Sequence, residues 1–197
     1  MHVFLGLGNP GPEYENTRHN VGAWVLSRLS ERLSAGFRRA HGCLWAQSTY
    51  RRRDILLLRP LEYMNLSGRA AARARRALFP RLDSARMVVI HDDLDLPLGS
   101  GRVKLGGGSG GHRGVDSMVH HLGDEGFGRV RVGIDRPPEG VEPSNYVLLP
   151  FAPEEREIVE RTADTAASAC LHIVELGYES AMNAYNGRDW SLNDPVA

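Results

Sequence analysis

Cysteine, lysine and long apolar runs are all scarce in this sequence. The two cysteines, Cys43 and Cys170, lie far apart in unrelated contexts, which argues against a disulfide or cysteine-based metal framework. Lys104 is the only lysine among 24 basic residues, a bias that coding composition explains better than arginine chemistry. No window approaches the roughly 18 consecutive apolar residues of a membrane-spanning helix, and the first residues lack a basic region before an apolar one. We therefore expect a cytoplasmic protein without a membrane segment.

Size and composition favour a globular protein with an uneven distribution of charge. We expect the 197 residues, 42% hydrophobic and 24% charged, to form a single domain over residues 1–197. Residues 1–86 contain 15 arginines against 6 acidic residues, whereas residues 137–197 contain 3 arginines against 11 acidic residues. The basic part could face an anionic polymer such as RNA, or it could be an ordinary solvated surface.

Apolar strands alternate with amphipathic helices along the chain. The pattern predicts strands near residues 3–7, 55–58, 87–90, 102–105 and 130–134. It predicts helices near residues 20–33, 66–78, 115–122 and 154–176, with a shorter helix after the last. This alternation indicates an α/β fold with a largely parallel sheet.

Three glycines in GLGNPG, residues 6–11, have the G-x-G-x-x-G spacing of dinucleotide-binding folds. In those folds the helix starts within the fingerprint, so that its amides meet the pyrophosphate. Here Pro12 removes a backbone donor and biases Gly11 away from helical geometry, which delays the helix to about residue 19. We therefore predict a tight turn that presents Asn9 and directs the loop towards His19, with no nucleotide cofactor.

Polar side chains follow three of the predicted strands. Asn9 and His19 come after the first strand, Asn65 after the second and Asp92 after the third. Because sites in open α/β sheets gather at the carboxyl ends of strands, parallel neighbours would bring these residues to one edge. A histidine, an acid and carboxamides at one edge suit hydrolysis by an activated water.

The segment HDDLD, residues 91–95, also contains oxygen and nitrogen groups that bind metal ions. Alternation along an extended loop places Asp93 and Asp95 on the same side, away from Asp92, and no second ligand cluster is evident. We therefore expect solvated loop acids here and no metal site.

Five motifs between about residues 4 and 151 resemble, in order and approximate spacing, those of the bacterial peptidyl-tRNA hydrolases. The motifs are GLGNPGPEYENTRHNVGAW, YMNLSG, HDDLDLPLG, KLGGGSGGHRG and VRVGIDRP. The resemblance implies an enzyme that hydrolyses the ester joining a peptide to the terminal ribose of tRNA. It also implies a monomer without a metal or organic cofactor, and a twisted mixed sheet sandwiched between helices.

The same resemblance implies the catalytic roles. His19 in TRHN matches the catalytic histidine, which as a neutral imidazole takes a proton from the attacking water. Asp92 matches its carboxylate partner, which fixes the imidazole tautomer and stabilises the charged ring. Asn9 matches a residue that discriminates blocked from free aminoacyl groups, since a carboxamide both donates and accepts hydrogen bonds. No serine or cysteine nucleophile is required.

Further positions match substrate contacts of the family. Asn65 matches an amide near the scissile ester, where it can also stabilise the oxyanion, and Tyr14 and Tyr63 match residues lining the path of the peptide and terminal adenosine. Loop packing is the alternative role for both tyrosines. The remaining candidates are basic residues for phosphate contacts with the acceptor stem, namely Arg102, Lys104 and Arg131.

Arg113 departs from the family, which often has an asparagine at this position. A guanidinium cannot accept a hydrogen bond but can bind a phosphate with two donors. The glycine-rich segment before it lacks the G-K-[ST] ending of a phosphate-binding loop, which excludes nucleoside triphosphate chemistry.

One alternative of another class is an RNA-binding relative that keeps the fold but lacks the chemistry, similar to a plant chloroplast splicing factor of this family. His19, Asp92, Asn9 and Asn65 argue against it, because a binding module has no need for all four together. Arg113 is the one feature that favours it.

Overall fold

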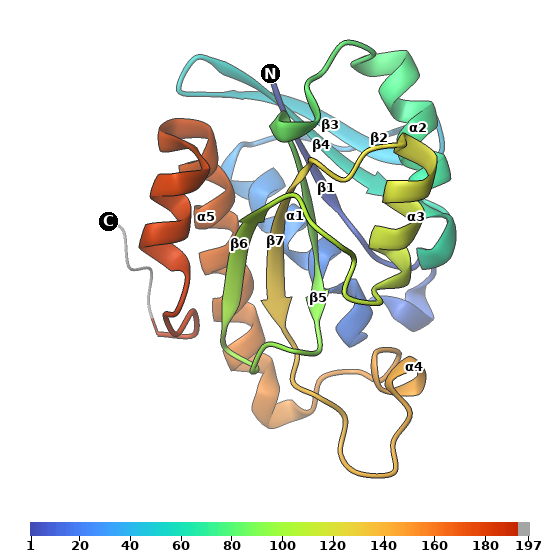
Figure 1. Ribbon diagram of the computed structural model, residues 1–197, viewed down its shortest axis with the longest axis vertical. Coiled ribbons are helices and arrows are strands. Elements are labelled where there is room, and N and C mark those ends of the chain that lie inside the picture. The colour runs from blue at the N-terminus through green and yellow to red at the C-terminus, as the bar shows by residue number, and fades with distance from the viewer. Residues whose placement is uncertain (193–197) are drawn as a thin grey trace.

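The computed structural model describes residues 1–192, which fold around a seven-stranded mixed sheet (Figure 1). Across the sheet the strand order is β2-β3-β4-β1-β5-β7-β6. The strands are β1 (His2–Gly6), β2 (Arg38–Ala40), β3 (Cys43–Tyr50), β4 (Arg53–Pro60), β5 (Met87–Asp93), β6 (Gly101–Leu105) and β7 (Gly128–Gly133). Parallel pairing joins β4, β1, β5 and β7 at the centre, and antiparallel pairing adds β3 and β2 at one side and β6 at the other.

Helices cover both faces of the sheet, which confirms the predicted α/β class (Figure 1). The α-helices are α1 (Val21–Arg32), α2 (Ser67–Leu78), α3 (Arg113–Leu122), α4 (Pro143–Tyr146) and α5 (Pro153–Tyr185). Phe4 of β1 packs with residues of α1 and α5, whereas its neighbours Val3 and Leu5 pack with α2 and α3. Because successive side chains of β1 point to two buried faces, the strand reads as one continuous apolar run. Among residues 1–192, no helix is both long and apolar enough to cross a bilayer.

The hairpin arm formed by β2 and β3 is absent from the sequence-based prediction. Half-exposed and exposed residues alternate along the outer part of β3, so no apolar run marks the strand. The turn into β4 consists of Arg51 and Arg52 with φ of 50° and 62°, where the usual signal for such a turn is Asn-Gly. Two arginines at positive φ leave the turn between β3 and β4 without a recognisable motif.

The C-terminal helix matches the prediction of a long helix followed by a shorter one. Helix α5 is interrupted at Gly177, whose φ of 85° and ψ of 175° are not helical. The exposed Leu176 immediately precedes this break. Glycine populates positive φ at little cost, so it separates two helical segments that continue in one element.

The outer edge of β6 is covered by the segment after α5. The Asn186 side chain donates to the Val103 carbonyl oxygen, 3.0 Å away, and accepts from the Val103 amide, 2.7 Å away. Trp190 is fully buried, and its backbone amide donates to the Gly99 carbonyl oxygen at 2.7 Å. Asn186 therefore occupies the hydrogen-bonding groups that a further strand would use at Val103.

Helix α1 approaches the sheet very closely at Gly22. A Cβ atom at this position would lie 2.3 Å from the Ile90 carbonyl oxygen and 2.8 Å from the Leu7 carbonyl oxygen. Only glycine fits between these backbones. The close approach brings the start of α1, which follows His19, next to the carboxyl end of β5, which holds Asp92.

Candidate active site

A pocket of about 750 Å³ lies at the carboxyl ends of the central strands. Strands β4, β1 and β5 are parallel neighbours, so the loops that follow them open at one edge of the sheet. This confirms the predicted convergence: Asn9, His19, Asn65 and Asp92 all line the pocket. The glycine-rich loop before α3 and the segment around α4 complete its walls.

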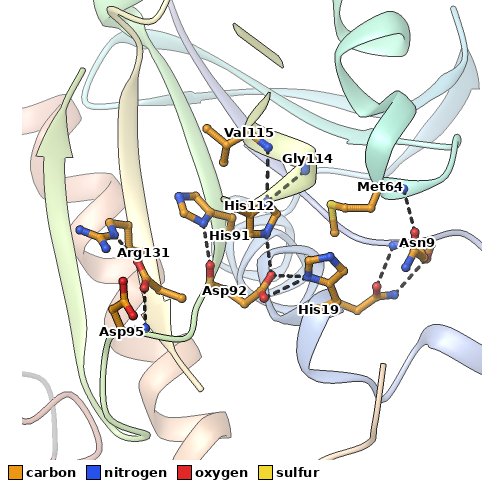
Figure 2. A network of polar contacts seen from close by, with 12 residues as sticks. Asn9, His19, Met64, His91, Asp92, Asp95, His112, Gly114, Val115 and Arg131 are labelled. Carbon is orange, nitrogen blue, oxygen red and sulfur yellow. Dashed lines mark hydrogen bonds and ion pairs between the residues drawn. The ribbon is translucent and has the colours of Figure 1, made fainter. Parts of the chain in front are cut away.

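Asp92 is the centre of a buried polar network (Figure 2). Nδ1 of His19 lies 2.8 Å from Oδ1 and 2.9 Å from Oδ2 of this carboxylate. Nε2 of His112 lies 2.8 Å from Oδ1. Burial alone would raise the pKa of the Asp92 carboxyl, but the attraction and hydrogen bonds of the two histidines hold that pKa well below its ordinary value. Asp92 is therefore ionised and accepts from both rings.

The second histidine has a tautomer fixed by its position at the start of a helix. Nδ1 of His112 accepts from the backbone amides of Gly114, at 3.1 Å, and Val115, at 3.3 Å, in the manner of an N-cap. A nitrogen that accepts has no proton, so the proton of neutral His112 is on Nε2 and points to Asp92 (Figure 2). The hydrogen bond between these two residues therefore runs from His112 as donor to Asp92 as acceptor.

The same reasoning assigns the proton of His19. Its Nδ1 faces only the oxygens of Asp92, so Nδ1 carries the proton of the neutral ring and Nε2 carries the lone pair. His19 lines the pocket, and within residues 1–192 no protein group forms a hydrogen bond with Nε2. A histidine in this state can accept a proton from a molecule in the pocket.

A third histidine, His91, contacts both Asp92 and His112. Nδ1 of His91 donates to the backbone oxygen of Asp92 at 2.7 Å, and its ring centroid lies 4.7 Å from that of His112. Complete burial, with the neighbouring His112, lowers the pKa of His91 well below its ordinary value. His91 therefore stays neutral and holds the backbone at Asp92 through its Nδ1 hydrogen bond.

Asn9 is held between two loops in one orientation. Its Oδ1 accepts from the backbone amide of Met64 at 2.7 Å, which joins the loop after β1 to the loop after β4. Asn20 braces its backbone, because Oδ1 of Asn20 accepts from the Asn9 amide at 2.7 Å and Nδ2 donates to the Asn9 carbonyl at 3.0 Å. One lone pair of Oδ1 is thereby engaged, and in this orientation Nδ2 is available to donate to a ligand.

Four further predicted residues lie on the pocket wall. The rings of Tyr14 and Tyr63 meet edge to face, with centroids 6.3 Å apart. Asn65 and Arg113 are both exposed, and among the described residues neither forms a hydrogen bond or ion pair with another side chain. All four are accessible to a ligand in the pocket.

The remaining basic candidates lie outside the pocket, on β6 and β7. Arg102 is opposite Arg131 in the antiparallel register, and Lys104 is opposite Arg129, so these four cations share one face of the sheet. Nε of Arg131 donates to Asp93, a residue of the pocket wall. Arg129 is buried and donates to the carbonyl oxygens of Gly107 and Gly108. It therefore braces the glycine-rich loop, and the other three cations form a basic strip beside the pocket.

Sequence reasoning missed one residue of this network, His112. His91 and Asn20 lie in loops that the sequence brings to this edge, although the pattern does not reveal that they bond to backbone atoms of Asp92 and Asn9. A signal existed for His112, since a polar residue directly before a predicted helix is a candidate cap. The predicted helix at residues 115–122 begins two positions after the observed start of α3 at Arg113. The prediction therefore does not place His112 directly before the helix, as its N-cap.

A metal ion would have to compete with existing hydrogen bonds. His19, Asp92 and His112 are the one group among residues 1–192 whose ligand atoms lie close enough for an ion, all within 4.8 Å. Two of those nitrogens, however, already bond to the Asp92 carboxylate at 2.8 Å. The other acids of HDDLD do not join this group, because Asp93 pairs with Arg131 and Asp95 with Arg136.

Comparison with known proteins places the chain in a family. A model of the family described as peptidyl-tRNA hydrolase matches residues 3–193. The chain is 43% identical over 189 residues to a peptidyl-tRNA hydrolase of Geobacillus kaustophilus, covering 94% of this chain and 100% of the relative. It is 44% identical over 183 residues to that of Rhodococcus erythropolis, covering 92% and 95%.

Solved structures agree with the sequence comparison. The crystal structure of the peptidyl-tRNA hydrolase from Acinetobacter baumannii superposes with a TM-score of 0.87 at 30% identity, covering 99% of this chain and 96% of that one. The described fold therefore has a counterpart there over nearly its whole length. The chain belongs to the peptidyl-tRNA hydrolase family.

Proposed function

We propose that this protein hydrolyses the ester between a peptide and the terminal ribose of tRNA, with His19 as the general base. The observation that carries the proposal is the state of His19. Its Nδ1 is bound to the Asp92 carboxylate at 2.8 Å, and its unprotonated Nε2 is available in the pocket. The side chains of the pocket have the following roles in this reaction.

In the proposed reaction, a water attacks the ester carbonyl while Nε2 of His19 takes one of its protons. Asp92 stabilises the resulting imidazolium through the Nδ1 hydrogen bond. The tetrahedral intermediate then expels the ribose oxygen, which takes the proton back from Nε2, leaving a free carboxylic acid and a free tRNA hydroxyl. A positioned base of this kind contributes a factor of about 10² to 10⁴ in rate.

His112 adds a second donor to the same carboxylate. Its Nε2–H occupies Oδ1 of Asp92 at 2.8 Å, so the carboxylate cannot rotate without losing a bond. A carboxylate held from two sides keeps the His19 ring in one plane, which supports the proximity that the proton transfer needs.

Asn9 supports discrimination of the blocked substrate through Nδ2. In N-acylated aminoacyl groups the acyl carbonyl can accept from this amide, whereas a free ammonium group only donates and would be repelled. Asn65 supplies a second side-chain amide, which has no hydrogen-bond partner among residues 1–192 and is suited to the oxyanion of the intermediate.

The tRNA is proposed to lie across the pocket and the basic strip. Tyr14 and Tyr63 face the peptide and the terminal adenosine, and Arg113 binds a phosphate at the pocket rim. Arg102, Lys104 and Arg131 contact phosphates of the acceptor stem. We further infer a cytoplasmic monomer that uses neither a metal nor an organic cofactor.

The decisive test is release of free tRNA from an N-acylated aminoacyl-tRNA, measured for the wild type and His19→Ala, with and without EDTA. We expect rapid hydrolysis by the wild type, unchanged by EDTA, and a rate about 10² to 10⁴ lower in the variant. Tight binding of the substrate without turnover by the wild type would instead favour an RNA-binding relative. Loss of activity in EDTA would assign a metal to His19, Asp92 and His112.

A further inference from the structure

Arg18 has an unusual environment for an arginine directly before the proposed base. Its side chain is 8% exposed, and Nη2 donates to Oε2 of Glu155 at 2.7 Å. The guanidinium carbon lies 4.4 Å from the ring centroid of Tyr146 and 4.9 Å from that of Phe151. The cation is thus held between the ring of Tyr146 in α4, the ring of Phe151 after it and the carboxylate of Glu155 in α5.

This burial is a weak source of stability. Nε and Nη1 of Arg18 are buried, and neither has a hydrogen-bond partner among residues 1–192. Removing a guanidinium from water costs free energy that one ion pair and two ring contacts offset only in part. An apolar side chain of similar length would fill the same space without this desolvation cost. Packing alone therefore does not explain why a charged residue is found at this position.

The backbone around Arg18 lies against the wall of the pocket. The amide of Arg18 donates to the Leu149 carbonyl oxygen at 3.0 Å, and the amide of His19 donates to that of Val147 at 2.8 Å. Thr17 and Pro150 form an isolated antiparallel bridge. Val147 is itself part of the pocket wall, so the proposed base and the wall share one short stretch of paired backbone.

Glu155 connects this stretch to the longest helix of the molecule. Its Oε2 also accepts from the backbone amide of Ala152 at 2.6 Å, which closes the N-terminus of α5. Residues of α5 are packed in the main hydrophobic core. Figure 1 shows the α4 segment beyond the carboxyl ends of β5 and β7, joined directly to α5. The Arg18–Glu155 pair therefore anchors the wall segment and the loop of His19 to one rigid helix.

We propose that Arg18 is a positioning residue, which fixes His19 relative to the pocket wall through Glu155, Tyr146 and Phe151. The inference rests on the proposed hydrolysis, because its effect is expressed through His19. Small displacements of a catalytic group cost up to about 100-fold in rate. Arg18 touches neither substrate nor the reacting atoms.

The test compares Arg18→Met with Arg32→Met, a matched control. Arg32 also joins α1 to α5, donating to the Ser168 hydroxyl at 2.7 Å and to the Asp164 carbonyl at 2.9 Å, but it does not contact the wall. With N-acylated aminoacyl-tRNA as substrate, we expect Arg18→Met to lower kcat about 10- to 100-fold, with a smaller change in KM. Arg32→Met is expected to keep kcat within about twofold, because Arg32 does not contact the pocket wall.

Two further variants keep the inference testable should Arg18→Met fail to fold. Arg18→Lys retains the charge beside Glu155 and should recover part of kcat, and Glu155→Gln should lower kcat by at least about threefold. In a His19→Ala background, Arg18→Met should cause no further loss, because the two residues act as a unit. Equal kcat in wild type and Arg18→Met would overturn the inference, as would additive losses in the double variant. A wild type without turnover would instead refute the proposed hydrolysis.

Discussion

At the scale of residues, the site depends on hydrogen bonds whose directions are fixed by backbone amides. Gly114 and Val115 impose the tautomer of His112, and Met64 imposes the orientation of Asn9. Each backbone N–H can only donate, so it determines which atom faces it. The amide donor that Asn9 offers to a ligand follows from the second constraint, whereas the lone pair on Nε2 of His19 follows from the bond of its Nδ1 to the Asp92 carboxylate.

The buried His91 gives the protein a predictable response to acid. Burial lowers the pKa of His91 well below its ordinary value, so below about pH 6.5 the unfolded chain binds a proton at this residue that the folded protein does not bind. The free energy of unfolding should therefore fall with decreasing pH, by up to about 1.4 kcal/mol per pH unit from this group. The loss begins near the ordinary pKa of histidine and continues down to the lowered value.

Urea unfolding of the wild type and His91→Leu at about pH 7 and pH 5 tests this statement. The variant lacks the titrating ring, so its stability should change less between the two pH values. An identical pH dependence in the two proteins would show that His91 does not contribute.

At the scale of elements, the contact between α1 and the sheet decides where the site forms. Replacing Gly22 with alanine would improve intrinsic helix propensity by about 1 kcal/mol. The new Cβ, however, would lie 2.3 Å from the Ile90 carbonyl oxygen, and backbone atoms cannot move aside cheaply. We expect the steric effect to dominate and Gly22→Ala to lower the free energy of unfolding by about 1–3 kcal/mol.

Gly36→Ala is the matched control, since a Cβ there would meet no atom within 4 Å. Chemical denaturation of both variants provides the comparison. Wild-type stability of Gly22→Ala would mean that α1 can move away from β5 without cost.

The central elements were predictable from sequence and the outer arm was not. Strands buried on both faces, such as β1 and β5, appear as apolar runs, and their parallel order explains the convergence of the loops. Strand β3 has one exposed face, so it lacks an apolar run. It is joined to β4 through Arg51 and Arg52, and an Arg-Arg pair is not a sequence pattern that predicts a turn with positive φ. His112 was missed for a similar reason, because its role depends on where α3 begins.

At the scale of the whole molecule, the basic strip beside the pocket does not come from the arginine-rich residues 1–86. The basic strip there consists of Arg102, Lys104 and Arg131 on β6 and β7. Charge counts along the sequence therefore gave no guide to this surface, because the sheet brings together residues from two strands in the middle of the chain.

The strip should make catalysis dependent on salt. Release of counterions from tRNA predicts that log kcat/KM falls linearly with log salt concentration. Lys104→Ala should reduce the magnitude of this slope by about 1, as expected for loss of one phosphate contact. Arg161→Ala is the control, since Arg161 pairs with Glu157 on the exposed side of α5, and it should leave the slope unchanged. Equal slopes for Lys104→Ala and the wild type would place the tRNA elsewhere.

The covering of β6 has a consequence for association between molecules. A free outer strand offers unpaired amides and carbonyls to the sheet of another molecule, which is a route to aggregation. Here Asn186 engages both backbone groups of Val103 at one border of the sheet. At the other border β2 is only three residues long and begins with Arg38 and Arg39, both exposed, and such short, charged strands are poor templates for pairing. Both borders therefore disfavour growth of the sheet from one molecule to the next.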